Sequence, residues 1–255
     1  MVEKHLLKWM GAVFAAILFI SIWATFAMLF NSFIFPGPLE VFESLITLIF
    51  TGEIFPHILA TLNRAIIGFL LGLILGSTLG YLTGMNKYID AVLKPIIELL
   101  RPIPPIAWIP LAILWFGIGD ASAFFIIFLA SFFPVFTSVY FGVTSLPIVC
   151  ERVSKNYSLT FSQKFVHIVF PFSVPYLING CKTAIGWAWM CVIAAEIIAS
   201  SQGLGYFIEI NRFSLNTSSV ISAMLIIGVI GLILQKVIQV IETKLTSWRS
   251  VSHGE

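Results

Sequence analysis

Long apolar runs, separated by short polar connections, extend over almost the whole sequence. A helix needs about 20 mainly apolar residues to cross a bilayer, and six stretches approach or exceed that length. We expect the spans at about residues 10–30, 57–85, 102–119, 121–143, 176–199 and 220–240. The pattern therefore predicts an all-α membrane protein with six transmembrane helices.

Positive charges indicate the orientation of these spans, because Lys and Arg favour cytoplasmic connections. Lys4 precedes the first span and Lys244 follows the last, so both termini are expected to be cytoplasmic. Arg101 and the two lysines before it mark a further connection on the cytoplasmic side. Of the 14 Lys and Arg residues, Arg212 is the one clearly assigned to the outside.

The composition supports this class of protein. Hydrophobic residues make up 59% of the chain and charged residues 10%, whereas an average soluble domain has about 25% charged residues. With 255 residues there is room for one membrane domain but not for a soluble catalytic module. The small net charge of +2 provides no basic patch for nucleic acid, and the three cysteines and four histidines show no metal-binding spacing. We expect no metal and no cofactor in this chain.

The N-terminal run, in residues 1–31, is too long for the apolar part of a secretory signal and is interpreted as a transmembrane helix. Residues 32–56 contain acids but no Lys or Arg, and their apolar positions recur at helical spacing. This predicts an amphipathic helix along the outer interface. Residues 57–247 would form the membrane core, and 248–255 a cytoplasmic tail.

Five glycines recur at every fourth position in the second span. Glycine is unfavourable inside a helix, so such a series favours close approach of another helix backbone. The alternative is that glycine is simply common in membrane helices. The helix-packing candidates are Gly68, Gly72, Gly76, Gly80 and Gly84.

Three prolines after Arg101 interrupt any continuous helix, because each lacks an N–H and clashes with the preceding turn. Broken backbone at membrane depth is tolerated where protein or a watery cavity covers it. This segment is therefore a candidate for lining a pathway, with plain helix packing as the alternative; two tryptophans in the middle of the fifth span share both interpretations. The pathway-lining candidates are Pro105, Trp108, Pro110, Trp187 and Trp189.

Ionisable residues inside spans are costly and indicate function or pairing. Arg64 and Lys182 lie near span ends, where each can extend to the lipid headgroups. Glu196 is shorter, and we expect it to bond the turn at residues 200–205 or to pair with a cation on a neighbouring helix. Lys182 and Glu196 are about 21 Å apart along a helix and cannot pair with each other. A substrate contact by Glu196 remains the less favoured alternative.

Residues 151–175 form the one long polar interruption in the second half of the chain. Within it, apolar residues at helical spacing predict a face that a cytoplasmic partner could bind, with Lys164 on its polar edge. The alternative is a helix lying on the membrane surface with Lys164 toward the headgroups. The expected face comprises Phe161, Phe165, Ile168 and Val169.

Three stretches together resemble the permease subunits of bacterial ABC importers: RPIPPIAWIPLAILWFGIG, VFPFSVPYLINGCKTAIGWAW and AAEIIASSQGLGYFI. The resemblance is to the binding-protein-dependent branch for nitrate, sulfonate, taurine or bicarbonate, and it runs from about residue 54 to the C-terminus. It implies a type I importer permease fold, a multi-pass protein of the bacterial inner (plasma) membrane, and a coupling segment at 151–171 on which an ATPase docks. ATP and Mg would belong to that ATPase. The other implied partners are a second permease copy, an external substrate-binding protein and membrane lipid, but no nucleic acid.

One part of the coupling segment departs from the family pattern. Arg152, Val153 and Ser154 stand where the family has Glu-Ala-Ala, and Ser158 stands on the usual glycine. Serine lacks the easy access to positive φ that glycine has. Either the docking geometry or the partner ATPase should therefore differ from the family pattern.

The sequence leaves three functions open. The first is a non-catalytic permease subunit that imports a small anion with energy from a separate ATPase. The second is a permease of the same class for a thiamine or riboflavin precursor. The third is an ion-coupled secondary transporter, which is disfavoured because the spans contain few ionisable residues near the bilayer midplane.

Overall fold

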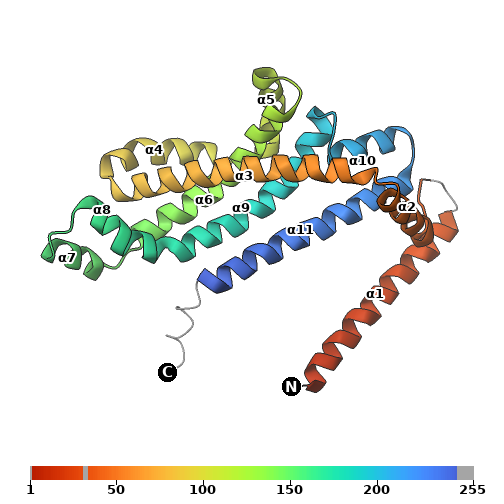
Figure 1. The fold of residues 1–255 in the computed structure, drawn as a ribbon, viewed down its shortest axis with the longest axis horizontal. Helices are drawn as coiled ribbons and strands as arrows, with labels where there is room; N and C mark the ends of the chain where they lie inside the picture. Colours follow the sequence, from red (N-terminus) through yellow and green to blue (C-terminus); the bar gives the residue numbers. More distant parts are fainter. Residues whose placement is uncertain (1, 31–33, 246–255) are drawn as a thin grey trace.

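The protein is all-helical over residues 2–30 and 34–245, the part described by the computed structural model. Figure 1 shows three long helices running side by side at its centre: α3 (Ile54–Met85), α6 (Asp120–Thr144) and α9 (Phe170–Ala199). A fourth, α11 (Thr217–Leu245), packs against α9. The all-α prediction is confirmed, and the expected tail at 248–255 lies outside the described residues.

Short helices gather at the two ends of this bundle. At one end, α7 (Ile148–Asn156) and α8 (Phe161–Lys164) connect α6 to α9 (Figure 1). At the opposite end lie α2 (Pro38–Phe50) and α10 (Leu204–Phe213) (Figure 1). The charge pattern predicts that the α7–α8 end is cytoplasmic.

The amphipathic helix expected within 32–56 is present as α2, which packs on α11. The hydroxyl of Ser222 on α11 donates a hydrogen bond of 2.9 Å to the carbonyl of Val41 on α2. Helix α1 (Val2–Phe30) diverges from the bundle in Figure 1. It is joined near α2, where the indole N–H of Trp23 donates 3.1 Å to the carbonyl of Pro36.

Four continuous helical stretches among the described residues are long and apolar enough to cross a membrane. They are residues 54–85, 120–144, 161–199 and 217–244. A fifth crossing is possible only if a bent helix pair counts as one span, and α1 contributes a shorter apolar stretch, Phe14–Phe30. The structure thus supports four or five of the six expected spans by length and composition.

The bent pair replaces the single span expected at residues 102–119. Helix α4 (Lys87–Leu100) folds back against α3 from the turn at Asn86, whose side chain caps it. The chain then breaks at 101–104, forms the 3-10 turn η1 (Pro105–Trp108) and continues as α5 (Ile109–Phe116), bent by 89° from α4. The prolines explain the break, since they cannot donate the hydrogen bonds of a continuous helix.

The glycine series of α3 lies against α6 where the two helices approach closely. A Cβ added at Gly72 would lie 2.5 Å from the Cβ of Ser131, and one at Gly76 would lie 2.8 Å from the carbonyl oxygen of Phe132. Gly68, Gly80 and Gly84 meet α6 in the same way. Glycine is therefore required along this helix contact.

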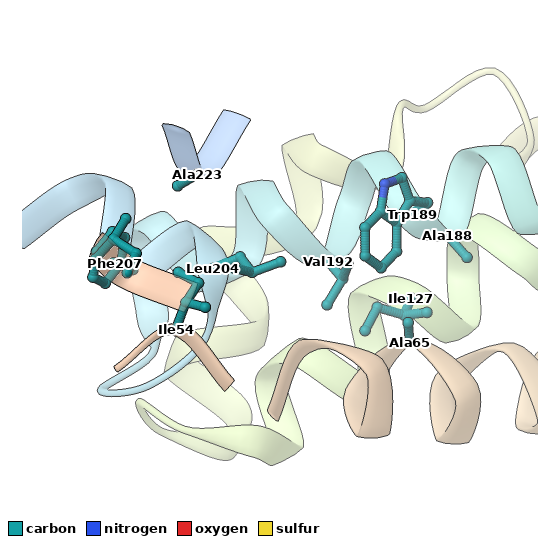
Figure 2. Packing of buried hydrophobic residues seen from close by; sticks show 10 residues of the cluster. Ile54, Ala65, Ile127, Ala188, Trp189, Val192, Leu204, Phe207 and Ala223 are labelled. Carbon is teal, nitrogen blue, oxygen red and sulfur yellow. The ribbon is translucent and has the colours of Figure 1, made fainter. Parts of the chain in front are cut away.

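A cluster of buried apolar side chains connects the long helices to α10, at the end of the bundle opposite α7 and α8 (Figure 2). Ala65 of α3 and Ile127 of α6 lie in it beside Trp189 and Val192 of α9. Leu204 at the start of α10 is completely buried in the same cluster. The position of α10 is thus fixed by the core rather than by surface contacts alone.

Candidate functional site

The segment between α6 and α9 is an irregular helical excursion. Its second half has a capping box, in which the Thr160 hydroxyl accepts from the Gln163 N–H and the Gln163 side chain accepts from the Thr160 N–H. After α8 the chain winds as a π-helix, η2 (Phe165–Val169), and enters α9 without a break. On α7, a hydrogen bond and positive charge from Lys155 lower the pKa of the exposed Glu151 carboxyl.

Ser158 occupies the left-handed backbone region, with φ of 49°. Its N–H donates to the carbonyl of Lys155 at 3.0 Å, and the N–H of Leu159 donates to Ser154 at 3.0 Å, so the turn closes α7. This conformation favours glycine, the residue that the family has at this position. Ser158 therefore adopts the left-handed backbone conformation of this turn, although glycine would adopt it more easily.

The structure corrects the expected partner-binding face. Val169 is 0% exposed and packs with the core around Tyr81 and Val139, so it contacts no partner in this conformation. Phe165 is half-buried, with its ring centroid 5.1 Å from that of Tyr81 in an edge-on contact. The π-helical turn and the packing against α3 direct these side chains inward. Of the expected apolar face, Phe161 is well exposed, at 63%.

Sequence reasoning missed a second set of exposed apolar residues, which lie on α7 and at its C-terminal cap. Val149, Val153 and Tyr157 are four residues apart and so share one side of the helix. All three are exposed. Their spacing in the sequence already places them on one helical face. We call the set the docking surface; it comprises Val149, Val153, Tyr157 and Phe161.

Lys164 and Ile168 line a cavity behind this surface. The cavity, of about 380 Å³, lies between the α3–α4 turn, the end of α6 and the coupling segment. Thr83 and Asp90 line it, and each has one buried side-chain oxygen without a hydrogen-bond partner among the described residues. These positions connect the coupling segment to the C-terminal end of α3 and the start of α4.

A second cavity, of about 410 Å³, lies beside the break between α4 and α5. Two of the pathway candidates, Pro105 and Trp187, line it together with Arg101. The cavity is otherwise lined by residues 102–104 of the break and by residues from the middle of α6 and α9, so Arg101 lies beside the middle of these helices rather than at their ends. Helix α4 folds back along α3 and so carries Arg101 to this depth, where its side chain is exposed in the single chain. This cavity is the candidate pathway site.

The other three pathway candidates lie elsewhere. Trp108 packs against Phe125, and its buried indole N–H has no partner in the described part of the chain. Pro110 is exposed in the first turn of α5 and lines none of the cavities described above. Trp189 is buried under α11, where its N–H donates 3.2 Å to the carbonyl of Ile227. For Trp189 the packing interpretation therefore applies.

Glu196 makes both contacts expected of it. It is 0% exposed and accepts hydrogen bonds from the guanidinium of Arg64 at 2.7 Å and from the N–H of Gly205 at 3.0 Å. The Thr61 hydroxyl donates to it as well, at 2.9 Å. Arg64 is buried rather than extended to the headgroups, and it also bonds Asp120 at 2.7 Å.

Lys182 has a separate partner, which agrees with the expectation that it does not reach Glu196. Its ammonium donates 3.0 Å to the carboxylate of Glu242 on α11. On α10, Arg212 donates hydrogen bonds to Glu209 and lowers the pKa of that carboxyl. Among the residues whose side chains the structure describes, there is no group of three His, Cys, Asp or Glu that could hold a metal.

Comparison with known proteins identifies the class. Residues 68–247 match the family described as binding-protein-dependent transport system inner membrane component. The chain is 31% identical to the putative aliphatic sulfonates transport permease protein SsuC of Bacillus subtilis (96% of this chain, 90% of that protein) and 30% identical to the taurine transport system permease protein TauC of Escherichia coli (92% and 87%). It is 35% identical to the nitrate import permease protein NrtB of Synechocystis (73% and 68%).

The fold has a counterpart among solved structures. A chain of the inward-facing MetNI methionine ABC transporter superposes with a TM-score of 0.62, at 18% identity, covering 73% of this chain and 93% of that chain. That likeness concerns the fold alone.

The chain belongs to the family of binding-protein-dependent inner membrane components, in the branch of nitrate, sulfonate and taurine permeases. It is a non-catalytic membrane permease of an ABC importer, whose ATPase is a separate subunit.

Proposed function

We propose that this chain is the translocating subunit of an ATP-driven importer for a small oxyanion or organosulfonate, such as a sulfonate, taurine, nitrate or bicarbonate. The observation that carries the proposal is the exposed apolar docking surface on the segment between α6 and α9. Similarity to the SsuC, TauC and NrtB permeases supports the substrate class.

The docking surface suits an ATPase. Phe161 and Tyr157 project apolar rings at the end of the bundle, and large exposed apolar patches mark interaction sites. Behind them η2 joins α9 directly, so displacement of the segment would act on a central helix. ATP and Mg would be bound by that partner, and closure of its dimer would move the attached helices.

The complete importer would contain two copies of this permease and an external binding protein that delivers the substrate. Six spans, including α1 and the bent pair, would place both termini in the cytoplasm. The coupling segment would then lie in the cytoplasm, and α2 and α10 would face the binding protein. Rocking of the two bundles would alternate access to the pathway.

Co-purification tests the proposal. The chain is expressed with the ATPase, reconstituted in proteoliposomes with the binding protein, and assayed for uptake of ethanesulfonate, taurine, nitrate and bicarbonate, with thiamine and riboflavin precursors as comparison. We expect recovery of the ATPase and ATP-dependent uptake of one of the anions. Uptake by the permease alone under an ion gradient would instead show a secondary transporter.

A further inference from the structure

We propose that the cavity beside Arg101 is an anion-binding site in the middle of the translocation pathway, selective for a sulfonate or a small planar oxyanion. The inference rests on the proposed function, which it deepens by assigning a site to the substrate. The site brings together one guanidinium, three hydroxyl groups and one indole. It is formed by the 101–105 break together with Thr137 and Ser138 of α6, and Thr183 and Trp187 of α9.

The depth of the cavity is the first argument. Pro134, in its wall, is 14 residues from the first residue of α6 and 10 from the last. At 1.5 Å per residue it lies about 21 Å and 15 Å from the two ends of that helix. A lipid headgroup stays near the membrane surface, so the anion that reaches this depth must be free in the pathway.

The charge is the second argument. The guanidinium of Arg101 makes no hydrogen bond or ion pair with any other described residue, and no Asp or Glu lines the cavity. The side chain is exposed in the single chain, but an ionisable group at the depth of Pro134 in a membrane is costly unless water or a counter-charge reaches it. The planar fork of Arg suits two oxygens of a sulfonate or nitrate. An incoming anion supplies the missing partner.

The remaining wall provides hydrogen-bond donors and an apolar surface. The hydroxyls of Thr137 and Thr183 donate to carbonyls one turn earlier, at 2.8 Å and 3.1 Å, and can rotate toward a ligand. Trp187 is half-exposed and covers one side, where the short carbon chain of an organosulfonate would lie. A volume of about 410 Å³ accommodates a small ligand with water.

Charge-selective labelling of a cysteine in the cavity tests this site. Thr183→Cys is introduced into a chain carrying Cys150→Ala, Cys181→Ala and Cys191→Ala, and the permease–ATPase complex is placed in nanodiscs. The reaction rates of a sulfonatoethyl and a trimethylammonioethyl methanethiosulfonate are then compared. Arg101→Gln should change each rate by about fivefold in opposite directions, the factor for one unit charge at about 4 Å in water, and so lower the anion-to-cation rate ratio by about 25-fold.

Lys94→Gln is the matched control, since it removes a cation from the same helix outside the cavity, and it should leave the ratio unchanged. Methanesulfonate or nitrate should slow labelling in the parent chain, and tetramethylammonium should not. If the complex with Arg101→Gln does not assemble, Arg101→Lys takes its place. The complex with Arg101→Lys must assemble and must keep the anion-to-cation rate ratio of the parent chain. An unchanged ratio in Arg101→Gln, or no protection by either anion, would overturn the site.

These outcomes are separate from failure of the proposed function. Labelling reports on the cavity without transport, whereas ATP-driven uptake by the wild-type complex reports on the importer. A carboxylate of a second copy that neutralises Arg101 would leave labelling insensitive to that residue and would also overturn the site.

Discussion

The guanidinium of Arg64 on α3 donates a 2.7 Å hydrogen bond to the carboxylate of Glu196 on α9, and both side chains are buried. The same guanidinium donates 2.6 Å to the carbonyl of Gln202, and the carboxylate accepts from Gly205 at the start of α10. One ion pair thus ties two central helices to the turn before α10. It is a structural contact at the end of the bundle opposite the coupling segment.

Glu196→Gln should destabilise the protein because it leaves the Arg64 charge buried with weaker compensation. Removing one partner of a buried pair costs about 3–5 kcal/mol. The measurement is the thermal unfolding midpoint and the yield of the detergent-solubilised chain. Glu209→Gln, which removes an exposed ion pair on α10, should leave both unchanged. A stable, well-assembled Glu196→Gln protein that only fails to transport would show a substrate contact instead.

Gly72→Ala should weaken the contact between α3 and α6. The added Cβ would lie 2.5 Å from the Cβ of Ser131 and 2.9 Å from the carbonyl oxygen of Phe128, so the helices must separate. Overpacking of this kind costs about 1–3 kcal/mol. Gly228→Ala in α11 is the control, because a Cβ added there meets nothing within 4 Å. The higher helical propensity of alanine should then stabilise α11. Equal midpoints for the two variants would contradict the packing role.

Ser158→Gly should stabilise the turn between α7 and α8, because φ at this residue is 49°. The left-handed conformation costs a non-glycine residue roughly 1–2 kcal/mol. Hydrogen exchange at the amides of Leu159 and Thr160 should slow in the variant. Ser162→Gly, inside α8, should speed exchange in the same segment, since glycine weakens a helix. Faster exchange in Ser158→Gly would show that the turn needs the serine.

Periodicity in the sequence was sufficient for some of these features. The glycine series predicts close packing because its period of four places every member on the same face of the helix. A close neighbour on that face can therefore be predicted from the spacing alone. Glu196 was expected to find a cation or the following turn because a short carboxylate cannot leave the membrane interior. Which cation it finds depends on the relative rotation of α3 and α9, which the pattern of one helix does not contain.

Other features could not be predicted for physical reasons. Basic residues usually mark connections at the ends of spans, yet α4 folds back against α3 and carries the exposed Arg101 to the level of the middle of α6. Val169 was expected on the partner-binding face, because helical spacing identifies a face but not what it packs against. The π-helical turn at 165–169 further rotates that face toward Tyr81.

Phe161→Asp should uncouple the permease from its ATPase. Phe161 is 63% exposed on the docking surface and packs little against the bundle, so a carboxylate there should disrupt the partner contact without unfolding the chain. Loss of one central apolar contact costs at least about 1.4 kcal/mol, a factor of ten in affinity. Phe165→Asp is less informative, because that side chain supports Tyr81. Tyr88→Asp, at an 86% exposed position of α4 outside the docking surface, is the matched control.

The most direct measurement is ATP-driven anion uptake by proteoliposomes that contain the chain, its ATPase and the binding protein. The account predicts uptake by the wild-type and Tyr88→Asp complexes and a loss of about tenfold or more in ATPase binding and uptake by Phe161→Asp. Wild-type uptake by Phe161→Asp, with normal ATPase recovery, would contradict the docking surface. Uptake that follows an ion gradient and needs no ATP would contradict the importer itself.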